Sequence, residues 1–141
     1  MYRVACTVGR LVEIAIWSPV SLDEVASWAA DHDATVRSVG GPYVCLVDLR
    51  GARVFPPAIV DAYTSAMRSE ATLVRTASYV PRDAVVGLQI SRMIREAGHP
   101  GRKAFDAAAP LLAYLGEVLT PVELARATAC VLGPIPGDAI A

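Results

Sequence analysis

Residues 43–57 read YVCLVDLRGARVFPP, and this stretch predicts the centre of the fold. It opens with five apolar, β-favouring residues between two glycine-containing turns, which is typical of a short strand buried on both faces. A polar turn follows at residues 48–51, and Pro56 and Pro57 favour a helix start because the first helical residue needs no amide hydrogen. In an open α/β sheet, the loop after such a strand is where ligands and partners usually bind.

The composition indicates one compact domain. A chain of 141 residues can bury one core, and 54% hydrophobic against 19% charged residues argues against disorder. The net charge of −1 gives no general attraction to nucleic acid or anionic membrane, so no nucleic-acid partner is expected. No run of about 18 apolar residues and no signal-peptide pattern is present, so we expect no integral membrane segment. Three cysteines, an odd number, favour free thiols in a reducing cytoplasm.

The apolar periodicity on both sides of the central stretch predicts a hairpin followed by strands that alternate with helices. Capping boxes at residues 21–24 and 120–123 mark two of the helix starts. The resulting order, ββαβαβαβαα, calls for an α/β fold with a mostly parallel or mixed sheet covered by helices. Residues 1–132 are expected to form one domain, and the Gly/Pro-rich residues 133–141 a loose tail. The expected strands are residues 3–8, 11–17, 43–47, 71–78 and 102–105, and the expected helices are 21–31, 57–67, 83–97, 106–115 and 120–132.

Two short phrases in the chain are similar to those of a known family. Residues 47–52 read VDLRGA, and residues 102–106 read RKAFD, followed by AYL at 113–115. The first resembles the strand and Asp-Leu-Ser-Gly-Val phrase that leads into the switch loop of STAS domains, and the second resembles the ending of small stand-alone members. The resemblance spans residues 11–115 and implies a STAS-like fold. It also implies a bacterial signalling role, since the type members are anti-sigma-factor antagonists, or lipid binding, since other relatives are lipid-transfer-like.

The chain departs from this family where the regulatory members are phosphorylated. Those members carry a phosphorylatable Ser or Thr at the start of the helix after the central strand. Residues 54–58 read VFPPA, which contains no hydroxyl. A phosphate acts by adding nearly two negative charges at such a helix start, and this segment has no group to accept it. The resemblance therefore implies a non-switching member, or one that is controlled differently.

The loop after the central strand is the predicted partner-binding site. We interpret Asp48, Arg50, Arg53, Phe55 and Pro57 as its contact residues, with Phe55 as an apolar anchor. An alternative for Asp48 is a turn aspartate that accepts from nearby backbone amides, beside a solvated arginine. An alternative for Phe55 is that its ring tucks under the loop.

A second candidate surface is basic. Arg92, Arg95, Arg102 and Lys103 follow one another late in the chain and favour a patch that faces an anion or an acidic partner. The alternative is an ordinary solvated helix face.

The sequence contains no recognisable catalytic or cofactor motif. His32 and His99 are the two histidines, and we expect both at the surface because neither has the spacing of a metal-binding motif. A nucleophile elbow, a P-loop and a dinucleotide fingerprint are all missing from the sequence, so no enzyme activity, cofactor or metal is expected.

The function expected from the sequence is a non-catalytic, cytoplasmic protein-interaction module in signalling. Homodimer formation through the exposed edge of the opening hairpin is a further expected route. The alternative is a small-molecule or lipid-binding domain of the same fold. That alternative requires an interior cavity lined by Tyr63, Met67, Met93 and Phe105.

Overall fold

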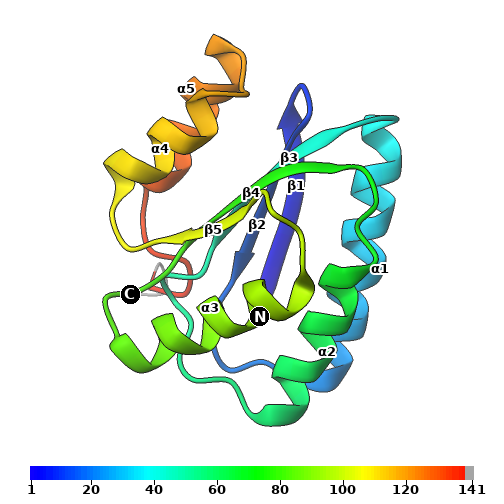
Figure 1. The fold of residues 1–141 in the computed structure, drawn as a ribbon, viewed down its shortest axis with the longest axis vertical. Coiled ribbons are helices and arrows are strands. Elements are labelled where there is room, and N and C mark those ends of the chain that lie inside the picture. The colour runs from blue at the N-terminus through cyan, green and yellow to red at the C-terminus, as the bar shows by residue number, and fades with distance from the viewer. Residues whose placement is uncertain (139–141) are drawn as a thin grey trace.

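The computed structural model describes residues 1–138, which form a five-stranded sheet flanked by five helices (Figure 1). The element order is ββαβαβαβαα, so the predicted α/β class and order are confirmed. The strands are β1 (Tyr2–Val8), β2 (Leu11–Ile16), β3 (Tyr43–Asp48), β4 (Leu73–Tyr79) and β5 (Arg102–Phe105). The helices are α1 (Leu22–Val39), α2 (Pro57–Arg68), α3 (Ala84–Ala97), α4 (Ala108–Gly116) and α5 (Pro121–Val131).

The strands lie in the spatial order β1-β2-β3-β4-β5, with β3 at the centre as predicted. β1 and β2 pair antiparallel as a hairpin, and the other neighbours pair in parallel, so the sheet is mixed. In the centre of the sheet, Leu46 of β3 lies between Glu13 of β2 and Ala77 of β4. Three connections between parallel strands each contain one helix, as this pairing requires.

Helices cover both faces of the sheet, which explains why β3 is apolar at almost every position. α1, α2 and α3 lie on the first face, and α4 and α5 on the second (Figure 1). Because successive side chains of a strand point to opposite faces, Tyr43 and Cys45 pack into the first core and Val44 and Leu46 into the second.

The first helix is longer than the sequence predicts. It begins with the predicted capping box but continues to Val39 rather than ending near residue 31. Val36 and Val39 extend its apolar stripe and pack against the first core. The helix therefore stays in contact with the core beyond the polar residues at 31–33. The helix ends at Gly40, whose φ of 76° is in the left-handed region that glycine adopts without strain.

Across residues 1–138, no helix combines the length and the apolar composition that are needed to cross a bilayer.

Candidate protein-interaction surface

Three loops meet at the carboxyl ends of β2, β3 and β4, because parallel strands end at the same edge of a sheet. The same edge holds the first turns of α1, α2 and α3, at the lower end of the molecule in Figure 1. The loop after β3, which carries the predicted site residues, lies between the other two. Its backbone is tied to the loop after β2, since the Arg53 amide donates to Ser18 Oγ at 2.9 Å.

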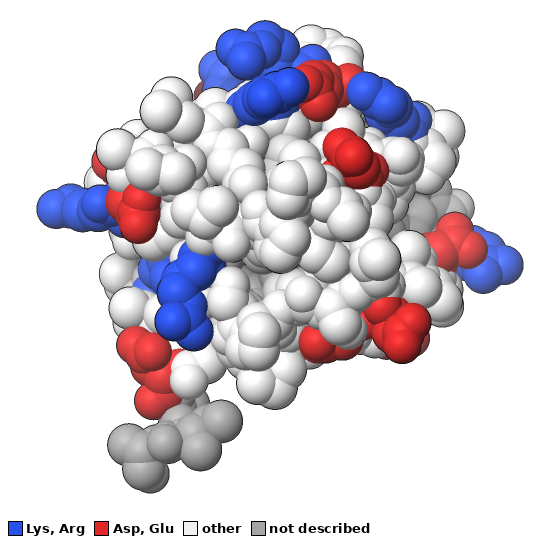
Figure 2. All heavy atoms as spheres, turned by 90° about the horizontal axis from the view of Figure 1, so that it is seen from below, with Lys and Arg blue, Asp and Glu red and all other residues white. Residues whose placement is uncertain are grey.

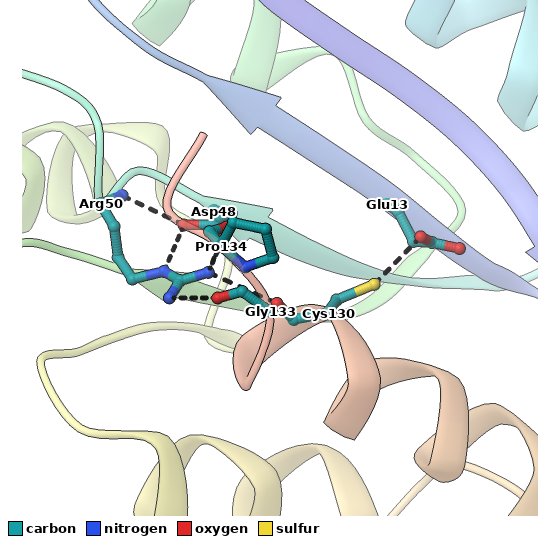
Figure 3. Close-up of polar contacts among 6 residues, drawn as sticks. All are labelled: Glu13, Asp48, Arg50, Cys130, Gly133 and Pro134. Carbon is teal, nitrogen blue, oxygen red and sulfur yellow. Dashed lines mark hydrogen bonds and ion pairs between the residues drawn. The ribbon is translucent and has the colours of Figure 1, made fainter. Parts of the chain in front are cut away.

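Asp48 and Arg50 form an internal connection rather than a free binding surface. Arg50 Nε and Nη2 donate to the two Asp48 carboxylate oxygens at 3.0 and 2.7 Å, and both side chains are only about one-tenth exposed. The same guanidinium donates to the carbonyls of Cys130, Gly133 and Pro134 at 3.2–3.4 Å (Figure 3). The bonds to Asp48 raise the pKa of Arg50 above its ordinary value. Arg50 therefore fastens the end of α5 to β3.

Residues 133–137, which belong to the expected loose tail, contact the rest of the domain. A Cβ placed on Gly51 would lie 2.1 Å from the Pro136 carbonyl oxygen, and one on Gly137 would lie 2.7 Å from the Trp17 ring. A side chain at either position would clash with these atoms. Glycine at residues 51 and 137 therefore allows the segment to pack this closely against the domain. Prolines end the helix here, but the contacts with Arg50 and Trp17 hold the chain that follows it. Residues 139–141 of the expected tail lie outside the described residues.

Phe55 belongs to the first core and is 4% exposed. Its ring packs against Tyr63 with centroids 5.7 Å apart. Its backbone is also held, because the Phe55 amide donates to Gln89 Oε1 at 2.8 Å and Gln89 Nε2 donates to the Phe55 carbonyl at 2.9 Å. The interpretation of Phe55 as a contact anchor is therefore wrong, and its ring lies under the loop. Arg53 and Pro57 are exposed, as a contact role requires.

Other apolar side chains are exposed beside this loop. Val54 is 52% exposed, Val85 60% and Leu88 73%. Val85 and Leu88 are one turn apart on α3, and the paired bonds between Phe55 and Gln89 hold the Val54 segment against the same helix. We call Val54, Pro57, Val85 and Leu88 the edge patch. Figure 2 shows this end of the molecule, where uncharged side chains fill the middle and charged ones lie mostly toward the margin.

A surface hollow borders the edge patch. Pro57 and Leu88 form part of its wall, together with Val60 and the Arg92–Glu96 ion pair, whose Nε–Oε1 distance is 3.0 Å. Its volume is about 430 Å³. The sequence held a signal for this surface, because Val85 and Leu88 fall outside the predicted buried stripe of the helix and form a second apolar pair at i, i+3.

The four residues of the predicted basic patch do not come together. Arg92 pairs with Glu96, and Arg95 is exposed on the same helix. Lys103 lies over the ring of Tyr114, with 4.8 Å to the centroid. Arg102 is buried in the interior, with a side chain 3% exposed. A strand alternates its side chains between faces, which separates the two β5 residues from each other.

Arg102 is part of a buried charged cluster that the sequence did not reveal. Its guanidinium pairs with the Glu70 carboxylate and donates to the Met67 carbonyl at 2.8 Å. His32, which we expected at the surface, is 6% exposed, and its Nε2 lies 3.0 Å from Glu70 Oε1. Burial alone would raise the pKa of the Glu70 carboxyl, but the His32 hydrogen bond and the Arg102 charge lower it below its ordinary value. Among residues 1–138, no three metal-ligating side chains gather in a geometry that suits a metal ion.

The interior cavity under α1–α3 is small. Tyr63, Met67 and Met93, three of the residues that the lipid-binding alternative requires, line it, and its volume is about 60 Å³. Phe105 does not line it, because its ring packs against Tyr114 on the second face, with centroids 5.5 Å apart. An engineered cavity of about 150 Å³ holds one benzene, so this space is too small for an acyl chain.

No family model, curated protein or solved structure matches the chain. The STAS-like assignment therefore remains a hypothesis that rests on the phrases at residues 47–52, 102–106 and 113–115.

Proposed function

We propose that the protein is a non-catalytic interaction module of STAS-like fold that acts in a bacterial cytoplasm and binds a protein partner through the edge patch. Three free cysteines, Cys6, Cys45 and Cys130, support a reducing compartment. The observation that carries the proposal is the group of exposed aliphatic side chains at the carboxyl edge of the sheet.

Single exposed apolar residues are common, and the edge patch differs because its members are grouped and held in place. Val85 and Leu88 are on a regular helix, and the Gln89 side chain fixes the backbone next to Val54. A surface that is already ordered loses little conformational entropy on binding, which favours affinity. The edge patch therefore has the rigid apolar centre and charged margin that are typical of a protein interface.

The proposal includes partner binding without a phosphorylation switch in this loop. α2 begins at Pro57, preceded by Pro56, and no side chain caps its first turn. Neither proline can carry a phosphate, so binding through this edge is expected to be constitutive or to be regulated elsewhere.

Replacement of Leu88 by serine together with Val54 by serine is expected to weaken partner binding at least about tenfold, because apolar anchors at the centre of an interface dominate its affinity. Both side chains are more than half exposed, so the free energy of unfolding should change little. The measurement is capture by the tagged protein from its native lysate, followed by titration of the purified partner against each variant.

Val122 and Leu132 provide matched controls, since they are 65% and 72% exposed and belong to the α5 side of the molecule. Their replacement by serine should leave capture intact. Equal losses in both double variants, or no loss in either, would contradict partner binding through the edge patch.

A further inference from the structure

A pocket of about 360 Å³ lies on the second face of the sheet, away from the edge patch. β1, β2 and β3 form its floor, α5 forms one wall, and residues 133–137 form another. Its volume is within the range of small-molecule sites, roughly 300–1,000 Å³. Its lining includes Arg3, Glu13, Trp17, Asp48, Arg126 and Cys130.

Two cations and two anions line this pocket, but Arg50, which lies outside the lining, takes up one of the anions, Asp48. Arg126 Nε lies 3.1 Å from both Glu13 carboxylate oxygens and its Nη2 lies 2.8 Å from Oε1, so these two charges are paired. The Asp48 carboxylate is likewise neutralised by Arg50. Arg3 also lines the pocket and forms no ion pair within residues 1–138. One positive charge is therefore in excess.

One hydrogen-bond donor of the lining is free as well. The Trp17 indole Nε1 has no acceptor among the described residues, but it is buried and does not reach the pocket surface. Arg126 uses Nε and Nη2 for Glu13, and its Nη1 makes no hydrogen bond to any residue from 1 to 138. The Cys130 thiol is already used, since its Sγ donates to Glu13 Oε1 at 3.1 Å (Figure 3), and burial together with Glu13 raises the pKa of this thiol to about 11. The free Arg126 donor favours a guest that accepts hydrogen bonds.

We propose that this pocket binds a small organic anion, whose carboxylate or phosphate group lies between Arg3 and Arg126. Guanidinium groups suit both anions because their donors match paired oxygens. The segment at residues 133–137 completes the pocket, and Arg50 holds that segment in place. The proposal is independent of the edge patch and of any protein partner.

The experiment is a titration of the full chain with succinate and with glycerol 3-phosphate at constant ionic strength, followed by NMR of the two tryptophan indole N–H groups. Trp17 lines the pocket, and Trp28, which is 4% exposed in the first core, is the internal reference. The Trp17 resonance should shift to saturation while that of Trp28 stays in place. The probe that saturates at lower concentration identifies carboxylate or phosphate as the preferred group.

Arg3→Gln should weaken binding by roughly tenfold or more, since a hydrogen bond to a charged group is lost. Arg82→Gln is the matched control, because Arg82 is an exposed arginine outside the pocket. This variant should bind the anion with the same affinity as the unmodified chain. Both side chains are exposed, so both variants should fold. The proposal is overturned if neither probe shifts the Trp17 resonance to saturation, if Arg3→Gln binds as well as Arg82→Gln, or if neutral succinamide binds as tightly as succinate.

Discussion

Replacement of Arg50 by alanine is expected to lower the free energy of unfolding by about 3 kcal/mol, because it leaves the Asp48 carboxylate buried without its partner. The same change frees the carbonyls of Gly133 and Pro134, so the segment after α5 should detach. For a chain of this length the melting temperature should fall by roughly 10 °C. Thermal and urea unfolding measure the loss, and amide hydrogen exchange locates it at the end of α5.

Arg53→Ala is the matched control, since Arg53 is in the same loop and is exposed. Its stability should stay within about 0.5 kcal/mol of the unmodified chain. Arg50→Lys should fall between the two, because an ammonium group keeps the charge but cannot donate two parallel bonds. If Arg50→Ala melted like Arg53→Ala, the connection between Asp48 and α5 would not contribute to stability.

Replacement of Glu70 by glutamine is expected to cost about 3 kcal/mol of unfolding free energy, because the Arg102 guanidinium then lies in the core without a counter-charge. Urea unfolding of the two proteins at neutral pH measures the difference. Glu96→Gln is the matched control: Glu96 is paired with Arg92 at the surface, where both side chains are at least 40% exposed, and surface pairs of this kind contribute little.

The Glu70 effect should depend on pH in one direction. The pKa of Glu70 is lower in the folded chain than its ordinary value of 4.5, so the carboxylate contributes its full stabilisation above that value. As the pH falls through the lowered pKa, the carboxyl becomes neutral and the contribution is lost. The stability difference between the unmodified chain and Glu70→Gln should therefore shrink in acid. A difference that stayed constant down to strongly acidic pH would argue against a buried ionised Glu70.

These stability effects decide which variants can test the proposed function. Arg50 and Phe55 stand in the predicted binding loop, yet both hold the fold together, so their removal would weaken partner capture for a purely structural reason. Leu88 and Val54 are exposed, and their replacement tests binding without unfolding the chain. A failure of the edge patch experiment would leave the anion pocket untouched, because the two surfaces share no residue.

The sequence by itself determined the order of the elements and the central place of β3. Both follow from short-range physics: apolar periodicity selects helix or strand, and glycine, proline and capping boxes mark the ends. The capping boxes at residues 21–24 and 120–123 are formed as predicted. The predicted end of the first helix is too early, because the polar residues at 31–33 resemble a turn. In the structure Val36 and Val39 still pack on the core, and the helix continues to Val39.

Only the tertiary structure decided which polar residues are buried and what they contact. Arg102 looks like a surface cation in the sequence, but its partner Glu70 is 32 residues away in the chain. Arg50 likewise contacts carbonyls that are 80–84 residues away. The pairing of such charges depends on which elements become neighbours, and no local pattern encodes this. For the same reason Phe55 could be recognised as apolar from the sequence, but only the packing of α2 and α3 around it shows that its ring faces inward.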